Sequence, residues 1–302
     1  MTSAILDIRH GARQAGQHGV DGASDGSAVQ RISVGSAKAV LLTVLGEFVF
    51  PECKPVWTST LVQVMVATGV AEKSARQAIA RAAAAGWIEG RKDGRRTSLS
   101  LTPRMERFMQ NGIVRVHSMG QLPEHWDGRW LALVLALPES HRAIRPRLYR
   151  QLGWAGFGNP SAGLWVNPHA GRIDEARRVV QKFELEGIAF AFVGTSIDMG
   201  MTDQMLVEQS WDLPRVSAHY DTLLERFGKL RPQSDESRLT AHVQLVHEWQ
   251  QLPFVDPGLP RELMPPDWRG YRVAHKLETL REKWAGPAHA YWKQLADAVP
   301  AR

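Results

Sequence analysis

The hydrophobic pattern first becomes regular between residues 36 and 50. Apolar side chains recur there every three or four positions and form one stripe, made of Val40, Leu41, Val44, Leu45 and Phe48. This spacing is typical of an amphipathic helix. Ser36 is the expected N-cap, because its hydroxyl can accept a hydrogen bond from a backbone N–H of the first turn. Pro51 is expected to end the helix.

Two further helices and a hairpin are predicted directly after this first helix. Residues 58–69 are expected to begin at a capping Thr58 or Ser59 and to end at Gly69. Residues 72–86 form the next predicted helix. Residues 87–102 contain two short β-prone stretches around a Lys-Asp-Gly turn, which indicates a hairpin, and another helix is expected at 102–112. Helices followed at once by a hairpin are the order of a winged helix-turn-helix domain.

The middle of the chain shows another order. Continuous apolar runs predict buried strands, and 3.6-residue periodicity predicts helices. The resulting elements are a strand at 129–137, a helix at 141–153, strand-like pieces at 156–168, a helix at 171–187 and a strand at 188–194. Strand, helix, two strands, helix and strand are the order of a ferredoxin-like unit.

From residue 202 onward the pattern is mostly helical. Helices are expected at 212–230, 235–252, 275–284 and 288–299, with a proline-rich, extended stretch at 253–270. The predicted fold class is therefore α+β. Its expected parts are a disordered tail at 1–30, a winged helix-turn-helix domain at 31–116, a ferredoxin-like middle domain at 117–200 and a helical C-terminal domain at 201–302.

The net charge of +6 is concentrated in one part of the chain. Residues 31–118 hold 13 Lys and Arg against 6 Asp and Glu, whereas residues 119–302 hold 22 of each. A basic domain on an otherwise neutral protein indicates a polyanionic partner for that domain. A surface that is basic without binding anything is the alternative that charge alone leaves open.

The helix predicted at 72–86 separates small apolar residues from basic and amide residues. At about 100° per residue, Ala75, Ile79, Ala82, Ala83 and Gly86 share one face. The opposite face carries Lys73, Arg76, Gln77 and Arg81 between alanines, and Ser74 belongs to the same candidate DNA-binding set. Such a helix fits the major groove, where arginine can pair with guanine and glutamine with adenine.

The hairpin supplies a second group of cations. Arg91, Lys92, Arg95 and Arg96 surround its tight turn. A tip of this kind can reach phosphates or the narrow minor groove. The helix face, the hairpin tip and the charge of the domain together favour binding of double-stranded DNA over a merely solvated surface.

Three stretches resemble the PaaX family of bacterial repressors of phenylacetate-degradation operons. They are SAKAVLLTVLGEFVF, ARQAIARAAAAGWIEGRKDGRRTSLSLTPR and HEWQQLPFVDPGLPRELMPPDWRG, and the resemblance runs from about residue 31 to the end. The resemblance implies the three-domain arrangement given above. It also implies a homodimer that binds a palindromic operator and is released by phenylacetyl-CoA.

A candidate effector site lies in the middle domain. Arg142, Arg145, Arg147 and Arg150 could hold the phosphates of a CoA thioester, and Trp154 and Trp165 could hold its aryl group. A dimer or interdomain surface explains the same residues equally well.

The sequence gives little indication of a metal site, a cofactor site or a catalytic site. His242 and His247 are five residues apart and do not share a helix face, so no metal site is expected, and no cofactor motif occurs. Ferredoxin-like nucleases carry an acidic residue after the first strand, but only Glu139 stands there. Cys53 has no cysteine partner and is expected to be buried or inert.

The compartment is inferred from what the sequence lacks. The longest apolar run, residues 130–138, is too short to span a bilayer, and no secretion signal opens the chain. One cysteine in 302 residues indicates a reducing compartment. A cytoplasmic protein without a membrane partner is expected.

The sequence therefore predicts a dimeric repressor without catalytic activity. Its expected targets are an aromatic-acid catabolic operon and an aryl-CoA thioester effector. An activator or dual regulator with another effector remains an alternative, as does an enzyme that handles CoA thioesters, which would need a catalytic dyad that the sequence does not reveal.

Overall fold

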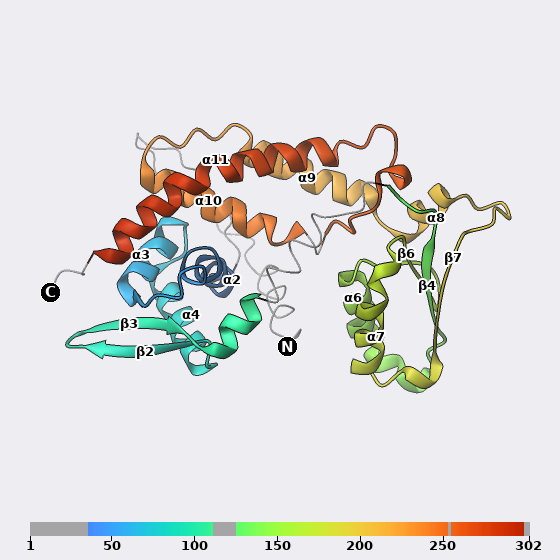
Figure 1. Ribbon diagram of the computed structural model, residues 1–302, viewed down its shortest axis with the longest axis horizontal. Coiled ribbons are helices and arrows are strands. Elements are labelled where there is room, and N and C mark those ends of the chain that lie inside the picture. The colour runs from blue at the N-terminus through green and yellow to red at the C-terminus, as the bar shows by residue number, and fades with distance from the viewer. Residues whose placement is uncertain (1–35, 111–124, 253–254, 299–302) are drawn as a thin grey trace, which may run out of the picture. The chain divides into compact units, whose positions relative to one another are not determined.

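The computed structural model describes residues 36–110, 125–252 and 255–298 (Figure 1). Its contacts divide the chain into two compact units. The first unit comprises residues 1–115, 226–249 and 276–302, and the second comprises residues 116–225 and 250–275. The predicted tail at 1–30 lies outside the described residues. None of the described helices is long and apolar enough to cross a membrane.

The first unit begins with helices and a small antiparallel sheet. The helices are α2 (Ala37–Val44), its π-helical continuation η2 (Leu45–Val49), α3 (Thr58–Ala67) and α4 (Glu72–Ala84). The strands are β1 (Val56–Trp57), β2 (Ile88–Asp93) and β3 (Arg96–Leu101), in the spatial order β1-β3-β2. Residues 103–110 are helical.

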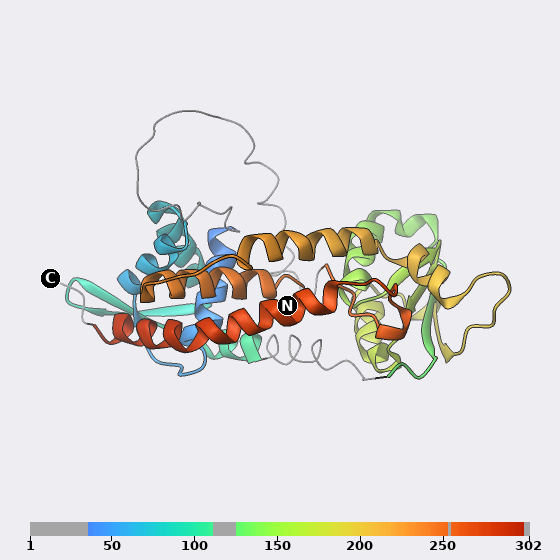
Figure 2. The ribbon, with the colours of Figure 1, turned by 90° about the horizontal axis from the view of Figure 1, so that it is seen from above.

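The core of this unit also draws on two C-terminal helices. Helix α10 (Asp235–Trp249) packs on α2 and α3, and α11 (Gly270–Asp297) contributes its last turns (Figures 1 and 2). Leu239 and Val243 of α10 and Ala288 and Trp292 of α11 are buried together with the apolar stripe of α2. The basic unit is therefore completed by residues about 200 positions further along the chain.

The second unit contains a four-stranded antiparallel sheet. Its elements are β4 (Trp130–Leu135), α6 (Arg145–Trp154), β5 (Gly158–Ser161), β6 (Leu164–Asn167), α7 (Ile173–Lys182) and β7 (Ala189–Gly194). The strands lie in the order β5-β6-β4-β7, with β7 at an edge. Leu131, Leu133 and Leu135 alternate along β4 and are buried with Leu148 and Leu152 of α6.

The opposite side of this sheet is only partly covered. Trp130 and Val166 are buried against residues of α8 (Asp203–Ser210), α9 (Leu213–Phe227) and the 3₁₀ helix η7 (Arg261–Leu263). The α+β class predicted from the sequence is confirmed. The division into three domains stays a prediction.

Of the two predicted N-caps in the first unit, one is confirmed and one is wrong. The hydroxyl of Ser36 caps α2 by accepting from the N–H of Ala39, as predicted. The N-cap of α3, however, is Trp57, without a side-chain hydrogen bond, because Thr58 Oγ1 instead donates to the carbonyl of Thr97 at 3.0 Å.

The segments at 275–284 and 288–299 are also not separate helices. They belong to one helix, α11, which continues through Pro287. Trp284, Ala288 and Trp292 are buried on both sides of this proline. Their burial stabilises the helix although the proline lacks the N–H that would bond to the preceding turn.

Candidate nucleic-acid interface

Helix α4 presents its basic residues to solvent. Ala75, Ala78, Ile79 and Ala82 are buried against the core of the first unit. All five predicted DNA-contacting residues of this helix are exposed, namely Lys73, Ser74, Arg76, Gln77 and Arg81. Ala83 was expected on the buried face but is exposed, and Ala78 takes its place. The small buried residues let α4 lie close to α2 and α3, which holds the exposed face in a fixed orientation.

One of these cations has an acidic neighbour. Arg76 Nε donates to Glu72 Oε1 at 2.9 Å, and both side chains are well exposed. Lys73 and Arg81 form no ion pair within the described chain. The exposed residues Ala80 and Ala84 lie between the charged residues. Their small side chains allow this face of the helix to approach another surface closely.

The hairpin places its cations around a two-residue loop. Asp93 of β2 pairs with Arg96 of β3, so Gly94 and Arg95 form the turn, and Gly94 has φ +58°. Glycine is suited to this left-handed conformation because it has no Cβ. Arg91, Lys92 and Arg95 are exposed and Arg96 is half-buried, and the described residues offer no ion-pair partner to any of the four.

The hairpin is fixed to the helices of its own unit. Thr102 Oγ1 donates to the carbonyl of Gly86 at 2.8 Å, at the end of α4. Leu99 and Leu101 of β3 are buried in the same core as α4, and β3 also pairs with β1. The basic face of α4 and the basic hairpin tip are therefore supported by the same core.

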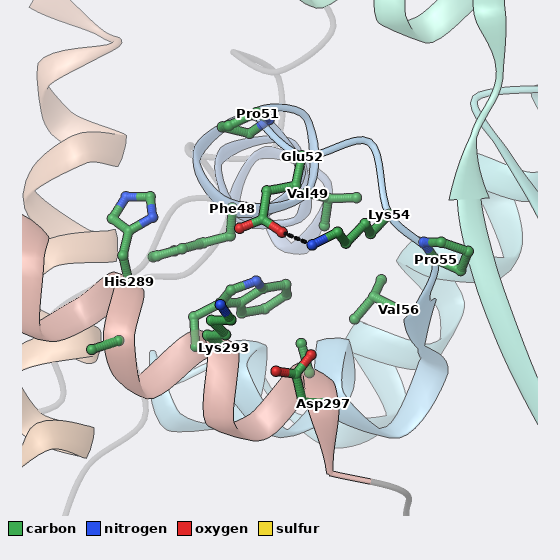
Figure 3. Close-up of a pocket in the computed structure, with 13 residues that line it drawn as sticks. Phe48, Val49, Pro51, Glu52, Lys54, Pro55, Val56, His289, Lys293 and Asp297 are labelled. Carbon is green, nitrogen blue, oxygen red and sulfur yellow. Dashed lines mark ion pairs between the residues drawn. The ribbon is translucent and has the colours of Figure 1, made fainter.

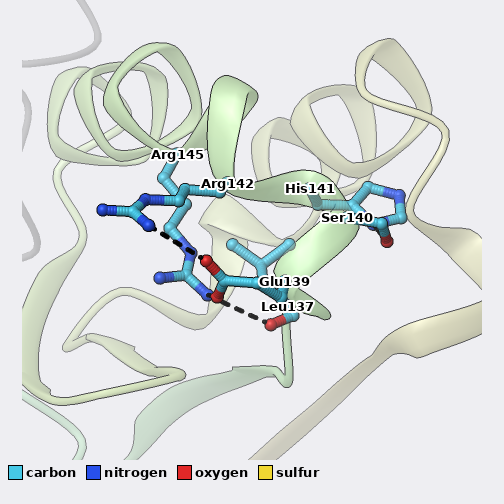
Figure 4. A network of polar contacts seen from close by, with 6 residues as sticks. All are labelled: Leu137, Glu139, Ser140, His141, Arg142 and Arg145. Atoms are coloured by element: carbon cyan, nitrogen blue, oxygen red, sulfur yellow. Dashed lines mark hydrogen bonds and ion pairs between the residues drawn. The ribbon is translucent and has the colours of Figure 1, made fainter.

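The predicted effector residues lie in the second unit and are mostly engaged with the protein itself. Glu139 lies 3.3 Å from Arg142 Nη1 and 3.6 Å from Arg145 Nη2, which also donates to the carbonyl of Leu137 (Figure 4). Glu139 is the acidic residue that a ferredoxin-like nuclease would need after its first strand, and Arg142 and Arg145 neutralise its charge. The carboxylate is thus committed to a structural network.

The remaining predicted effector residues are scattered over α6 and the sheet. Trp165 is buried in the core, where its ring meets the edge of Tyr149 at 4.8 Å between centroids. Trp154 and Arg150 are half-buried, and Arg147 is exposed. Trp165 therefore cannot serve as a wall of an open pocket without a rearrangement of that core.

A cavity that the sequence analysis missed lies elsewhere in the second unit. It has a volume of about 510 Å³ and is lined among others by Trp126, Arg129, His169, Arg172 and Glu175. Arg129 is bound to Asp127 at 2.7 Å and Arg172 to Glu175 at 2.8 Å. Burial lowers the pKa of His169, which keeps its ring neutral. The lining residues come from three segments, near residues 125–129, 168–175 and 260, which lie far apart in the sequence. Their spacing along the chain therefore could not have predicted this cavity.

Cys53 is exposed, so of the two expected alternatives, a buried or an inert thiol, the first is wrong. Its Sγ donates to the carbonyl of Phe50 at 3.0 Å. Partial burial and the charge of Glu106 raise the pKa of the thiol. A thiol with a raised pKa is a poor nucleophile at neutral pH.

Comparison with known proteins identifies the family. Residues 36–105 match the model of PaaX-like proteins, residues 123–206 match the PaaX protein central Cas2-like domain, and residues 211–294 match the PaaX-like protein C-terminal domain. The chain is 25% identical over 274 residues to the transcriptional repressor PaaX of Escherichia coli strain K12, which covers 87% of this chain and 84% of that protein.

A solved structure supports the fold. The uncharacterized protein Rv0674 from Mycobacterium tuberculosis aligns with a TM-score of 0.57 and 20% sequence identity, over 84% of this chain and 97% of that chain. The protein described here belongs to the PaaX family. This is a family of transcriptional regulators and not of enzymes.

Proposed function

We propose that this protein is a transcriptional repressor that binds double-stranded DNA through a winged helix-turn-helix formed by α2, α3, α4 and the β2–β3 hairpin. The observation that carries the proposal is that the core of the first unit supports two basic surfaces, one on α4 and one on the hairpin. Seven cations lie on α4 and the hairpin, and only Arg76 has an acidic partner among the described residues. The name of the Escherichia coli relative, a transcriptional repressor, points to the same activity.

The two surfaces have different roles in this proposal. Arg76, Gln77 and Arg81 of α4 contact base edges in the major groove, where their side chains can distinguish base pairs. Lys73, Ser74 and the hairpin cations contact phosphates, which position the protein without reading sequence. Arg91, Lys92, Arg95 and Arg96 make up this second set on the hairpin.

The repressor acts as a homodimer in this proposal. Strand β7 lies at the edge of the second unit's sheet and exposes Phe190, Phe192 and Val193 by 60%, 62% and 47%. Phe190 and Phe192 pair with Val134 and Ala132 of β4, so they lie on the sheet face opposite the α6 and α7 core. A second copy would cover this apolar edge, and its two-fold axis would impose a palindromic operator.

The effector belongs to the second unit in this proposal and is an aryl-CoA thioester such as phenylacetyl-CoA. Arg142, Arg145, Arg147 and Arg150 offer charge for its phosphates, and Trp154 offers an aromatic contact. The cavity beside Trp126, Arg129 and Arg172 is an alternative place for the same ligand, because it combines an indole with guanidinium groups inside a defined volume.

Selection of binding sites from random DNA duplexes tests the function. The full-length protein should enrich an inverted repeat whose half-sites lie about one helical turn, or a multiple of it, apart. Addition of phenylacetyl-CoA should release the selected DNA, whereas CoA alone should not. Recovery of unenriched DNA after several rounds would contradict sequence-specific binding.

A further inference from the structure

Three side chains from distant parts of the chain meet inside the first unit. Glu47 lies in η2, His242 in α10 and His289 in α11. Glu47 Oε1 is 2.8 Å from His242 Nε2 and 3.0 Å from His289 Nε2. The three ligand-type atoms all lie within 4.8 Å of one another. Neither the DNA-contacting surfaces nor the effector proposal uses this cluster.

The carboxylate occupies an irregular turn of the first helix. Helix α2 changes at Leu45 to π-helical bonding, in which the N–H of Phe50 donates to the carbonyl of Leu45 at 2.8 Å. Single π turns in α-helices are frequently found at functional sites. The irregular turn therefore coincides with the residue that joins two histidines.

The side chains of Glu47 and His242 are largely withdrawn from solvent, whereas that of His289 is partly exposed. The side chain of His242 is fully buried, and its Nδ1 has no hydrogen-bond partner in the described chain. When Nε2 binds a metal, the ring proton lies on this Nδ1, and its unpaired N–H is a cost that the metal–ligand bonds must outweigh.

We propose that Glu47, His242 and His289 bind a divalent transition metal ion, with zinc as the best match. Two histidine nitrogens and one carboxylate oxygen form a frequent three-ligand set for zinc, which leaves a fourth position open. Ligands about 2.1 Å from a zinc ion lie roughly 3.4 Å apart in tetrahedral geometry. The distances from Glu47, 2.8 and 3.0 Å, are those of hydrogen bonds and are shorter than this value, so the three ligand atoms would move apart slightly when a metal ion replaces the shared protons. The ring of His289 is 43% exposed and can turn toward His242 to complete the set.

A cavity adjoins His289. A cavity of about 290 Å³ is lined by this ring, by Phe48 and Trp292, and by Lys54 and Lys293 (Figure 3). Glu52 binds Lys54 at 2.6 Å across the same cavity. The cavity reaches His289 but is not lined by Glu47 or His242. In this proposal a metal ion enters on the His289 side, and water from the cavity supplies the fourth ligand.

Bound metal would connect three elements of the first unit. Helices α10 and α11 would be tied to the turn at the end of the first helix. Because metal binds only the folded arrangement, it should stabilise that unit in proportion to its affinity. This inference does not rest on DNA binding, so the two proposals fail independently.

Direct titration of the untagged full-length protein tests the site. After chelation and removal of the chelator, zinc titrated in a calorimeter should bind once per chain in the wild type. Glu47→Gln and His289→Ala should each weaken binding at least tenfold. His141→Ala is the matched control, because it removes a histidine from the second unit that is bonded to Ser140 and has no part in the cluster.

Cobalt(II) gives a second measurement on the same proteins. It should produce visible absorption of a four-coordinate site in the wild type and in His141→Ala, and this absorption should be absent in Glu47→Gln. Circular dichroism shows whether each variant is folded. If His289→Ala does not fold, the conservative variant Glu47→Gln alone tests the metal site. Zinc binding that is absent from the wild type, or equal in wild type and Glu47→Gln, would show that the cluster is only a hydrogen-bonded support.

Discussion

The guanidinium of Arg76 is bound to Glu72 one helical turn earlier in α4, with Nε 2.9 Å and Nη2 2.8 Å from the same carboxylate oxygen. The pair holds Arg76 along the exposed face of the helix. An exposed pair of this kind contributes only about 0.2–1 kcal/mol. A phosphate or a guanine can therefore replace Glu72 as the partner of Arg76. The ion pair orients the Arg76 side chain in the absence of DNA.

Removal of the Glu72 charge should strengthen DNA binding. In Glu72→Gln, the negative charge that would face the DNA backbone is lost, whereas the size of the side chain is kept. We expect random duplexes to bind roughly two- to fivefold more tightly, which corresponds to at most about 1 kcal/mol. Fluorescence anisotropy at fixed salt measures this change. Weaker binding to random DNA would mean that α4 does not face the duplex.

The hairpin should contribute phosphate contacts. Changing Arg95 and Arg96 together to Ala should weaken selected and random DNA alike. The slope of log affinity against log salt should become shallower by roughly 1.8, since each phosphate contact releases about 0.9 counterion. Arg177→Ala is the control, because this exposed arginine of α7 pairs with Asp174 in the second unit. An unchanged slope in the double variant would exclude the hairpin from the interface.

The C-terminal helix should be needed for the stability of the basic unit. Trp292 is buried and stacks on Phe48 of η2, with ring centroids 5.0 Å apart. Trp292→Ala should lower the free energy of unfolding of this unit by about 3–5 kcal/mol through lost burial and a residual cavity. Urea unfolding followed by circular dichroism measures it. A loss below about 1 kcal/mol would show that α11 does not belong to this core.

The exposed edge of β7 should mediate the dimer. Introducing charge in Phe190→Glu and Phe192→Glu together should give a monomer, because two carboxylates would be desolvated at the contact. Light scattering after size exclusion measures the mass. Val66→Glu is the matched control, since Val66 is an exposed apolar residue of α3 in the other unit. A double variant that stays dimeric would place the contact elsewhere.

Local sequence signals were sufficient for the elements that carry the proposed interface. The spacing of Ala75, Ile79 and Ala82 predicted the buried side of α4, and Gly86 and Gly94, both with positive φ, marked its end and the hairpin turn. These features depend on neighbours within a few residues. The error at Ala83 arose because a small residue near a helix end fits either face.

Long-range features could not be predicted from the sequence. A 3.6-residue period identifies an apolar stripe but not its partner, so the packing of Leu239 and Trp292 on α2 was not foreseen. The same reason hid the cluster at Glu47, whose two histidines are 195 and 242 residues away. His242 was considered only with its near neighbour His247, which instead lies 3.2 Å from Thr43 Oγ1 through its Nδ1.

Titration of selected DNA with α4 variants tests the central proposal most directly. At one salt concentration, Arg76→Ala and Arg81→Ala should each raise the Kd for the selected inverted repeat about 5- to 150-fold, the loss of one base-specific contact. Their Kd for random duplex should change far less, and their circular dichroism should match the wild type, because both side chains are exposed. An unchanged Kd for the selected repeat in both variants would contradict recognition of DNA by α4.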